Sequence, residues 1–267
     1  MTAVNLRPSM PRTPAGSLDP QGPAEEHGVP TRREDGVISR LKVGTVHLSY
    51  VETGSGDSIL FIPGLIGLAA QWSHQVDYFG KEHRAIAFDH RGAGQSDKPM
   101  QEYTTSLFAE DAVGLLDTLS IGQAHIVGAS TGGAIAQVLA LEYPSRVQSL
   151  TLVSTWARPD AYYRRIQEMR KRVLLMMGVE PYIKLSSVWT AGPTQFRDML
   201  AGLEAFEAAQ VQQAAPVEVM AARIDATLEH DRLDQLARIT VPTMVVVADD
   251  DTLVPPYLGE TIAAATR

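Results

Sequence analysis

The chain has 267 residues, of which 45% are hydrophobic and 20% charged, so it is long enough for one large α/β domain or two small ones with a buried core. Its formal net charge of −8 argues against binding to nucleic acid or to anionic membranes, because both require basic surfaces. The absence of cysteine excludes disulfides, thiolate zinc sites and a cysteine nucleophile, and it is compatible with the cytoplasmic location that we expect. The sequence has no apolar run near the roughly 20 residues of a transmembrane helix.

Residues 1–36 are rich in Pro, Gly, Arg and Glu and lack the apolar core of a signal peptide. This composition predicts a disordered Pro-rich extension, and a partner-binding tail is the alternative. Ordered sequence begins near Val37. Two β-rich runs, 38–43 and 46–51, are joined at Gly44-Thr45 and predict an antiparallel hairpin at a sheet edge.

The next part of the chain alternates between strands and helices. Continuous apolar runs at 58–62 and 84–89 predict strands buried on both faces, and 124–129 and 147–154 follow as further strands. Helical periodicity extends over 104–119, with Thr105 or Ser106 as the N-cap, and over 132–143 before Pro144. Such alternation predicts an α/β fold with a doubly wound, mostly parallel sheet.

The alternation stops after residue 154. Residues 155–215 contain no strand signal and predict an inserted helical lid, so that 37–154 and 216–267 form the α/β core. Within the lid, 160–177 is an amphipathic helix whose basic residues are expected on its solvated side, and attraction of an anionic substrate is the alternative for them. The large apolar side chains predicted to line a pocket or to pack within the lid are Trp156, Met169, Met176, Met177 and Trp189. The core resumes with a helix over 217–238, a strand over 243–248 and a last helix near Tyr257.

A Gly-x-Ser-x-Gly pattern, from Gly128 to Gly132, lies between a predicted buried strand and a predicted helix. A strand that turns at once into a helix crowds its own backbone, and glycines two residues either side relieve that crowding. Ser130 at the apex is then expected on strained dihedrals, with its Oγ raised above the helix N-terminus as a nucleophile. A phosphate cradle is the alternative for a Gly-rich strand–helix turn. A second Gly-rich loop, Gly92-x-Gly94, lacks the third glycine of a dinucleotide-binding turn, and Pro99 prevents a helix there. We therefore do not interpret this loop as a dinucleotide site.

The combined motifs, which cover nearly all of the chain after residue 37, resemble those of the α/β-hydrolase superfamily. They are Ile62-Pro63-Gly64-Leu65 with Trp72, the loop 89–96, the turn 128–133, and the segment from Val241 to Pro255. Within that superfamily the chain is similar to 3-oxoadipate enol-lactonases and to the aminoacrylate hydrolases of pyrimidine utilisation. The resemblance implies that Ser130 attacks a carbonyl carbon and that the backbone N–H groups of Leu65 and Thr131 hold the oxyanion. Pro63 stands where family members often carry histidine, which leaves the backbone donor in place.

The resemblance also implies an acid residue that orients a catalytic histidine, and family spacing before Pro255 assigns it to Asp251. Asp249 and Asp250 precede it, so a different register is an alternative. A metal site made of the three aspartates is the other alternative, although adjacent residues at a strand end point in different directions. We expect no metal and no cofactor.

No histidine follows Asp251, whereas the superfamily order is serine, acid, histidine. No catalytic histidine is therefore found in this chain, and the last strand and helix of the fold are expected to be missing. We expect a truncated form of an active hydrolase, with a natural short form as the alternative. The predicted activity is cleavage of a small carboxylic ester or lactone, a small-molecule substrate, through an acyl-enzyme. A hydrolase of C–N or C–C bonds and a catalytically impaired binding protein are the alternatives.

Overall fold

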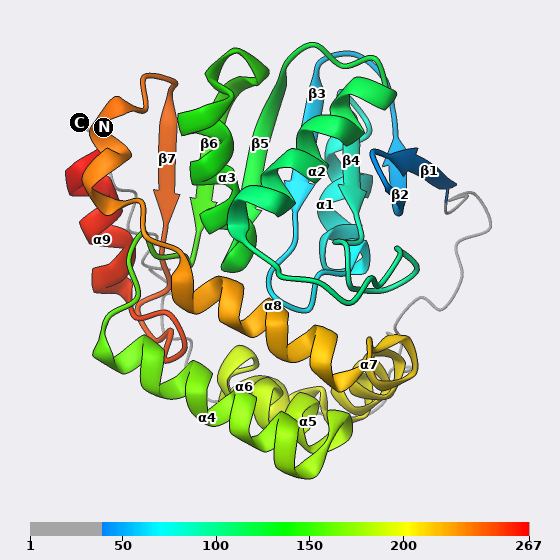
Figure 1. Ribbon diagram of the computed structural model, residues 1–267, viewed down its shortest axis with the longest axis vertical. Helices are drawn as coiled ribbons and strands as arrows, with labels where there is room; N and C mark the ends of the chain where they lie inside the picture. Colours follow the sequence, from blue (N-terminus) through cyan, green and yellow to red (C-terminus); the bar gives the residue numbers. More distant parts are fainter. Residues whose placement is uncertain (1–38, 267) are drawn as a thin grey trace, which may run out of the picture.

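The computed structural model describes residues 39–266 and shows a seven-stranded sheet with helices on both faces (Figure 1). The sheet has the order β1-β2-β4-β3-β5-β6-β7, and only the pairings of β2 with β1 and β4 are antiparallel. The strands are β1 (Ser39–Val43), β2 (Val46–Thr53), β3 (Ser58–Ile62), β4 (Arg84–Phe88), β5 (Ala124–Ala129), β6 (Val147–Val153) and β7 (Thr243–Val246). The predicted α/β class with a mostly parallel sheet is confirmed. The extension predicted over 1–36 lies outside the described residues.

Alternation along the central strands buries both faces of the sheet. In β3, Leu60 and Ile62 join the larger hydrophobic cluster, whereas Ile59 and Phe61 join a smaller cluster on the opposite face. Side chains of a strand point alternately to its two faces, so an uninterrupted apolar run is what a strand covered on both sides requires. The continuous apolar run at 58–62 therefore corresponds to a strand that is covered on both faces.

The helices of the α/β core divide between these two faces. A 3₁₀ turn, η1 (Ala69–Trp72), and α1 (Ser73–Phe79) supply Trp72 and Val76 to the smaller cluster. The larger cluster is covered by α2 (Thr105–Thr118), α3 (Thr131–Glu142), the 3₁₀ segment η3 (Leu233–Arg238) and α9 (Pro256–Ala265), and the short η2 (Pro144–Arg146) follows α3.

A block of helices stands between β6 and β7 in the sequence. It contains α4 (Ala161–Met177), α5 (Val179–Thr190), α6 (Pro193–Asp198), α7 (Leu200–Gln213) and α8 (Val217–Glu229). Figure 1 shows the block beyond the carboxyl ends of β6 and β7, with α8 between the sheet and the other helices. Ligands of open α/β sheets bind at this end of the strands, so the block stands over the end of the sheet where a ligand would bind.

Two expected helix boundaries were wrong. The N-cap of α2 is Thr104, whose hydroxyl accepts the N–H of Leu107 at 3.0 Å, and neither Thr105 nor Ser106 takes that role. The helix expected over 217–238 ends at Glu229 and resumes as 3₁₀ turns from Leu233. The break follows from a distant contact, because the N–H of Arg232 donates to the carbonyl of Ala157 at 2.8 Å.

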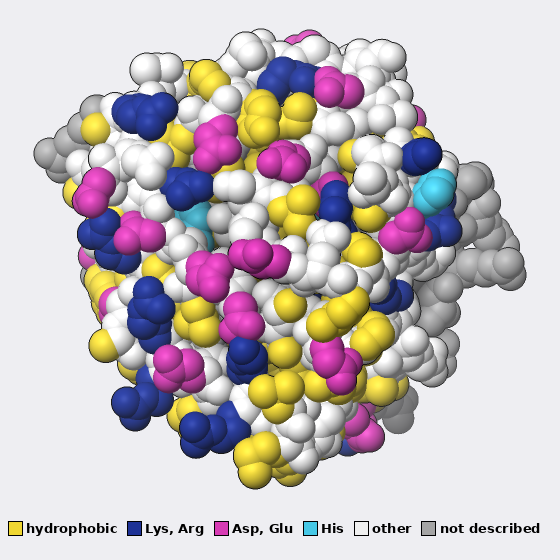
Figure 2. All heavy atoms as spheres, viewed as in Figure 1, with side chains coloured by type: hydrophobic (Ala, Val, Ile, Leu, Met, Phe, Trp, Pro, Cys, Tyr) yellow, Lys and Arg dark blue, Asp and Glu magenta, His cyan; other side chains and the backbone are white. Residues whose placement is uncertain are grey.

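The inner side of α4 also differs from the prediction that its methionines line a pocket or pack within the lid. Met169, Met176 and Met177 are exposed, whereas Gln167 and Arg170 are buried on the inner side. Arg170 is buried because Gln167 accepts one of its N–H groups and Ser186 accepts others. Figure 2 shows Lys and Arg side chains gathered at the lower left, over α4, so most of the basic residues of this helix are solvated as expected.

Among the helices between residues 39 and 266, none is both long enough and apolar enough to cross a lipid bilayer.

Candidate active site

Ser130 lies at the turn between β5 and α3, on a strained backbone conformation. Its dihedrals are φ 53° and ψ −118°, a region that residues with a side chain rarely adopt. Several contacts maintain this turn: the N–H of Ser130 donates to the carbonyl of Val153 at 2.9 Å, and the Thr155 hydroxyl donates to the carbonyl of Ser130 at 2.7 Å. The side chain of Ser130 is partly exposed. A serine on a forced turn, open to solvent, is well placed to act as a nucleophile.

The two glycines of the motif are required by close backbone contacts. A Cβ on Gly128 would lie 2.2 Å from the carbonyl oxygen of Gly132, and a Cβ on Gly132 would lie 2.1 Å from that of Ile62. Both distances are far inside van der Waals contact and involve backbone, which cannot swing aside. The steric reason inferred from the sequence thus matches the packing at both positions.

The loop after β3 lies directly against Ser130. β3 and β5 are parallel neighbours, with Ile62 opposite Gly128, so their carboxyl ends meet at one point of the sheet. A Cβ built on Gly64 would lie 3.5 Å from the Cβ of Ser130 and 4.0 Å from its Oγ. The structure therefore brings Leu65, the next residue, into the neighbourhood of Ser130 and Thr131. Within the described residues, the backbone N–H groups of Leu65 and Thr131 donate no hydrogen bond to a protein acceptor.

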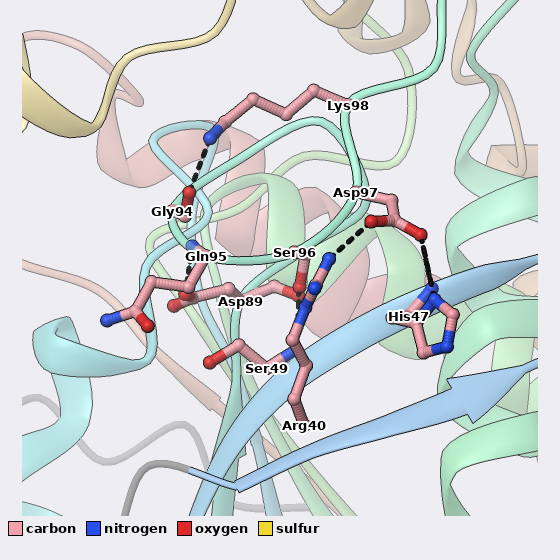
Figure 3. Close-up of polar contacts among 9 residues, drawn as sticks. All are labelled: Arg40, His47, Ser49, Asp89, Gly94, Gln95, Ser96, Asp97 and Lys98. Atoms are coloured by element: carbon pink, nitrogen blue, oxygen red, sulfur yellow. Dashed lines mark hydrogen bonds and ion pairs between the residues drawn. The ribbon is translucent and has the colours of Figure 1, made fainter.

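The loop after β4 supports the loop after β3. Asp89, buried at its start, accepts the N–H groups of Ala69 and Gln95, both at 2.8 Å. Burial raises the pKa of the Asp89 carboxyl, and these two N–H groups act in the opposite direction. Figure 3 shows how the loop is fixed farther out, where Asp97 contacts His47 and Arg40 of the β1–β2 hairpin.

A buried ion pair joins the loop after β4 to α2. The Nε–H of Arg91 donates to a carboxylate oxygen of Asp111 at 2.9 Å, and a second N–H of the guanidinium reaches the other oxygen at 2.5 Å. Burial raises the pKa of Asp111, whereas the hydrogen bonds and charge of Arg91 lower it. The loop after β4, which supports the loop next to Ser130, is therefore anchored to the core by charged side chains.

Of the three consecutive aspartates after β7, only Asp251 is partly buried. One oxygen of its carboxylate accepts the N–H groups of Leu253 and Val254, at 2.9 and 2.8 Å. These two residues pack in one cluster with Ala134, which lies in the first turn of α3 directly after Ser130. The structure thus favours Asp251 over its neighbours as the candidate acid. Among residues 39–266, no group of three or more acidic or histidine side chains converges in a metal-binding arrangement.

None of the described histidines is hydrogen bonded to Ser130 or Asp251. His230 ends α8 and contacts the Thr105 hydroxyl through Nδ1 at 3.0 Å, and His125 contacts the Ser149 hydroxyl at 2.7 Å. Burial lowers the pKa of His230 to about 3. Each of these two side chains is thus paired with a hydroxyl group of another residue and not with Ser130 or Asp251.

A pocket lies between the loop after β3 and the helical block. The space between these parts measures about 450 Å³ when open solvent is included, and its wall contains Leu65 but not Ser130. The helical block contributes Tyr182, Ile183, Gln210, Gln213, Met220 and Arg223 to the lining. The methionines predicted to line the pocket or pack within the lid do neither, because Met169, Met176 and Met177 are exposed. Trp156 and Trp189 follow the packing alternative, in a cluster with Tyr163 and Ile166 of α4.

Arg223 is the residue of this region that sequence reasoning missed. It is 4% exposed and donates to the carbonyl of Leu65 at 2.6 Å and to that of Gly92 at 3.1 Å. The sequence did contain a signal, because Arg223 interrupts the apolar face of α8, four residues after Val219 and next to Ile224. A charge on the buried face of a helix marks either a paired ion or a functional group.

The seven-stranded topology, the serine turn and the order of the loops define an α/β hydrolase. The family described as "alpha/beta hydrolase fold" matches residues 57–178. The chain belongs to this family, as the sequence predicted, and it is a hydrolase of the α/β type.

Several known proteins are similar to the chain over most of its length. The RutD protein of Azorhizobium caulinodans, whose name designates a carbamate hydrolase, is 37% identical over 220 residues, which cover 82% of this chain and 83% of that protein. A thermophilic esterase from Thermogutta terrifontis has a TM-score of 0.77 and 27% identity, covering 85% of this chain and 86% of its own. The enol-lactonase from Burkholderia xenovorans LB400 has a TM-score of 0.78 over 85% of this chain and 87% of its own, and at 24% identity it shows the fold alone.

Proposed function

We propose that the chain is a serine hydrolase in which the Oγ of Ser130 attacks the carbonyl carbon of a small substrate. The attack forms an acyl-enzyme and expels the leaving group with a proton, and water then releases the acid and restores the serine. The observation that carries the proposal is the strained turn at Ser130, held by backbone contacts that leave the side chain open to solvent. Strain of this kind persists only where the surrounding structure imposes it.

The proposed oxyanion donors are the backbone N–H groups of Leu65 and Thr131. Both lie next to Ser130, and Thr131 opens α3, so the positive end of the helix dipole faces the same place. Donors fixed before the reaction stabilise the negative charge that develops on the carbonyl oxygen. The loss of one such donor typically costs about 3 kcal/mol in the transition state.

Asp251 is the proposed acid residue. It lies between β7 and α9, and it accepts the N–H groups of Leu253 and Val254, which pack in one cluster with Ala134 at the start of α3; this position supports the role. The proton of the Ser130 hydroxyl requires a general base, and no described histidine contacts that hydroxyl. We therefore expect slow turnover by this chain, of the order that an oxyanion hole and substrate binding provide without a base.

The proposed scissile bond is the C–N bond of a small carbamate or a related compound. The 37% identity to a protein named as a carbamate hydrolase supports this substrate class. A carboxylic ester or lactone, which the sequence placed first, is the second candidate, supported by the esterase that shares 27% identity. The same serine chemistry acts on both, because each presents a carbonyl carbon with a leaving group.

Labelling with a fluorophosphonate tests the proposal, because such probes react with nucleophilic serines, and without a general base we expect the labelling of Ser130 to be slow. We expect the chain to be labelled at Ser130 and Ser130→Ala not to be. Ser120→Ala is the matched control, because Ser120 is an exposed serine that also has a positive φ, of 58°. Equal labelling of Ser130→Ala and Ser120→Ala would refute the role of Ser130. Competition between p-nitrophenyl carbamates and p-nitrophenyl esters would then rank the two substrate classes.

A further inference from the structure

We propose that Arg223 is a positioning residue that holds the peptide groups around Leu65 and so fixes the direction of the Leu65 N–H. The inference deepens the proposed function and rests on it, because it concerns the oxyanion donor of that reaction. It makes α8, a helix of the inserted block, part of the support of the site.

The contacts of Arg223 connect two loops of the core with the helical block. One Nη–H donates to the carbonyl of Leu65 at 2.6 Å, and the other donates to the carbonyl of Gly92 at 3.1 Å. The guanidinium therefore links the loop after β3 to the loop after β4. It is packed so closely that a Cβ on Gly67 would lie 2.4 Å from the nearer Nη.

The peptide groups on either side of Leu65 are held in different ways. The carbonyl of Gly64 accepts the N–H of Gly67 at 2.9 Å, which closes a tight turn. In a trans peptide the N–H points opposite to the carbonyl, so this bond directs the Leu65 N–H away from the turn. The following peptide group is held through its carbonyl by Arg223. With both groups fixed, the two dihedrals of Leu65 have little freedom.

The side chain of Leu65 is anchored in the same block of helices. It packs against the cluster that contains Leu174, Tyr182, Ile183 and Ile224, which come from α4, α5 and α8. Backbone and side chain of Leu65 thus both depend on the inserted helices. A shift of α8 would move both the Leu65 carbonyl, through Arg223, and the surface on which the Leu65 side chain packs.

A contribution to the stability of the fold does not by itself explain why Arg223 is buried at this position. No described carboxylate lies within ion-pair distance of the guanidinium, and its Nε–H has no partner. Desolvation lowers the pKa of Arg223 to about 10, so the side chain is still charged at neutral pH. A buried charge without a counter-ion is costly, and an apolar side chain of similar size is often neutral or stabilising in its place.

Arg223→Met tests the inference, because it removes both donors and keeps an unbranched, flexible side chain. The matched control is Lys171→Met. It removes an ion pair, at 2.6 Å, between Lys171 of α4 and Asp225 of α8, the helix that carries Arg223. The first measurement is hydrogen–deuterium exchange of the segment 61–69 in the full chain. We expect faster exchange of this segment in Arg223→Met and unchanged exchange in Lys171→Met.

The second measurement is the kinetics of labelling by a fluorophosphonate, whose phosphoryl oxygen requires the same donors as a carbonyl oxygen. We expect the first-order rate at saturating probe to fall about tenfold or more in Arg223→Met, short of the roughly 10²–10³ for outright loss of a donor, with little change in the half-saturating concentration. Arg223→Lys keeps the charge but has a single donor nitrogen in place of two, so it should recover part of the rate. Lys171→Met should label as the parent chain does.

The outcomes separate this inference from the proposed function. Normal labelling of the parent chain with unchanged exchange of 61–69 in Arg223→Met would overturn the role of Arg223. So would a loss of rate no larger than that of Lys171→Met. Absence of labelling at Ser130 in the parent chain would instead refute the proposed function. If Arg223→Met does not fold, Arg223→Lys gives the same readouts, and its full retention of rate and exchange would also overturn the inference.

Discussion

His230 makes the stability of the fold depend on pH. The imidazole is 2% exposed, with Nδ1 at 3.0 Å from the Thr105 hydroxyl and Nε2 without a partner. Burial lowers its pKa from 6.5 to about 3, and the charge of Arg232 acts in the same direction. The folded state therefore keeps His230 neutral at pH values where the unfolded chain is already protonated.

The sign and magnitude follow from proton linkage. As the pH falls through 6.5, the unfolded state binds a proton that the folded state does not bind until about pH 3. The free energy of unfolding thus decreases between these two values. Acidification from about pH 7.5 to about pH 5 removes about 2 kcal/mol through this side chain alone, since one pKa unit corresponds to about 1.4 kcal/mol.

Urea unfolding followed by far-UV circular dichroism at both pH values measures this effect. His230→Gln has no titrating ring, so its loss of stability on acidification should be smaller than that of the parent chain by about 2 kcal/mol. His74→Gln, at an exposed position of α1, is the control and should follow the parent chain. The comparison uses the change with pH, so a constant destabilisation by the substitution does not affect it. Parallel pH profiles of the parent chain and His230→Gln would refute the reasoning.

Three further predictions concern Ser130: two test residues that support it, and one tests its lack of a general base. Gly132→Ala places a Cβ 2.1 Å from a backbone carbonyl and should lower the melting temperature by several degrees or prevent folding. Gly122→Ala is the control and should leave the melting temperature unchanged, because nothing lies within 4 Å of its Cβ position. Equal melting temperatures of the two variants would contradict the packing argument. Asp111→Ala leaves a buried arginine without its partner and should lower the free energy of unfolding by about 3–5 kcal/mol in urea titrations, and a loss under 1 kcal/mol would count against it. Added imidazole should raise the rate of p-nitrophenyl ester hydrolysis by supplying a general base, and an equal rise with Ser130→Ala would show that the reaction is not at the site.

Features set by neighbouring residues were predictable from the sequence. The strands were recognised because burial on both faces requires continuous apolar runs, as in 58–62. The strained turn at Ser130 was recognised because its glycines relieve crowding that arises within a few residues. The assignment of Asp251 as the acid rests on the family spacing before Pro255 and stays a prediction, and the structure adds that Asp249 and Asp250 are exposed.

Features set by distant contacts were not predictable in the same way. Arg170 and Arg223 carry charges that normally indicate a solvated face, yet Arg170 also bonds Ser186 of α5 and Arg223 bonds two loops of the core. The end of α8 depends on a bond between Arg232 and Ala157, more than 70 residues away in the sequence. The periodicity of one helix contains no information about such partners. For this reason Met169, Met176 and Met177, which were predicted to line a pocket or to pack within the lid, are exposed instead.

The arrangement of α8 bears on how new specificities could be built into this scaffold. Because β6 and β7 pair with each other, the inserted helices start and end at adjacent strands, and a foreign block could replace them without altering the order of the sheet. A chimera that keeps its junction before α8 retains Arg223, whereas one with its junction after α8 loses the guanidinium that reaches Leu65. Recombination libraries should therefore exchange α4–α7 and leave Val217–Glu229 as part of the recipient chain.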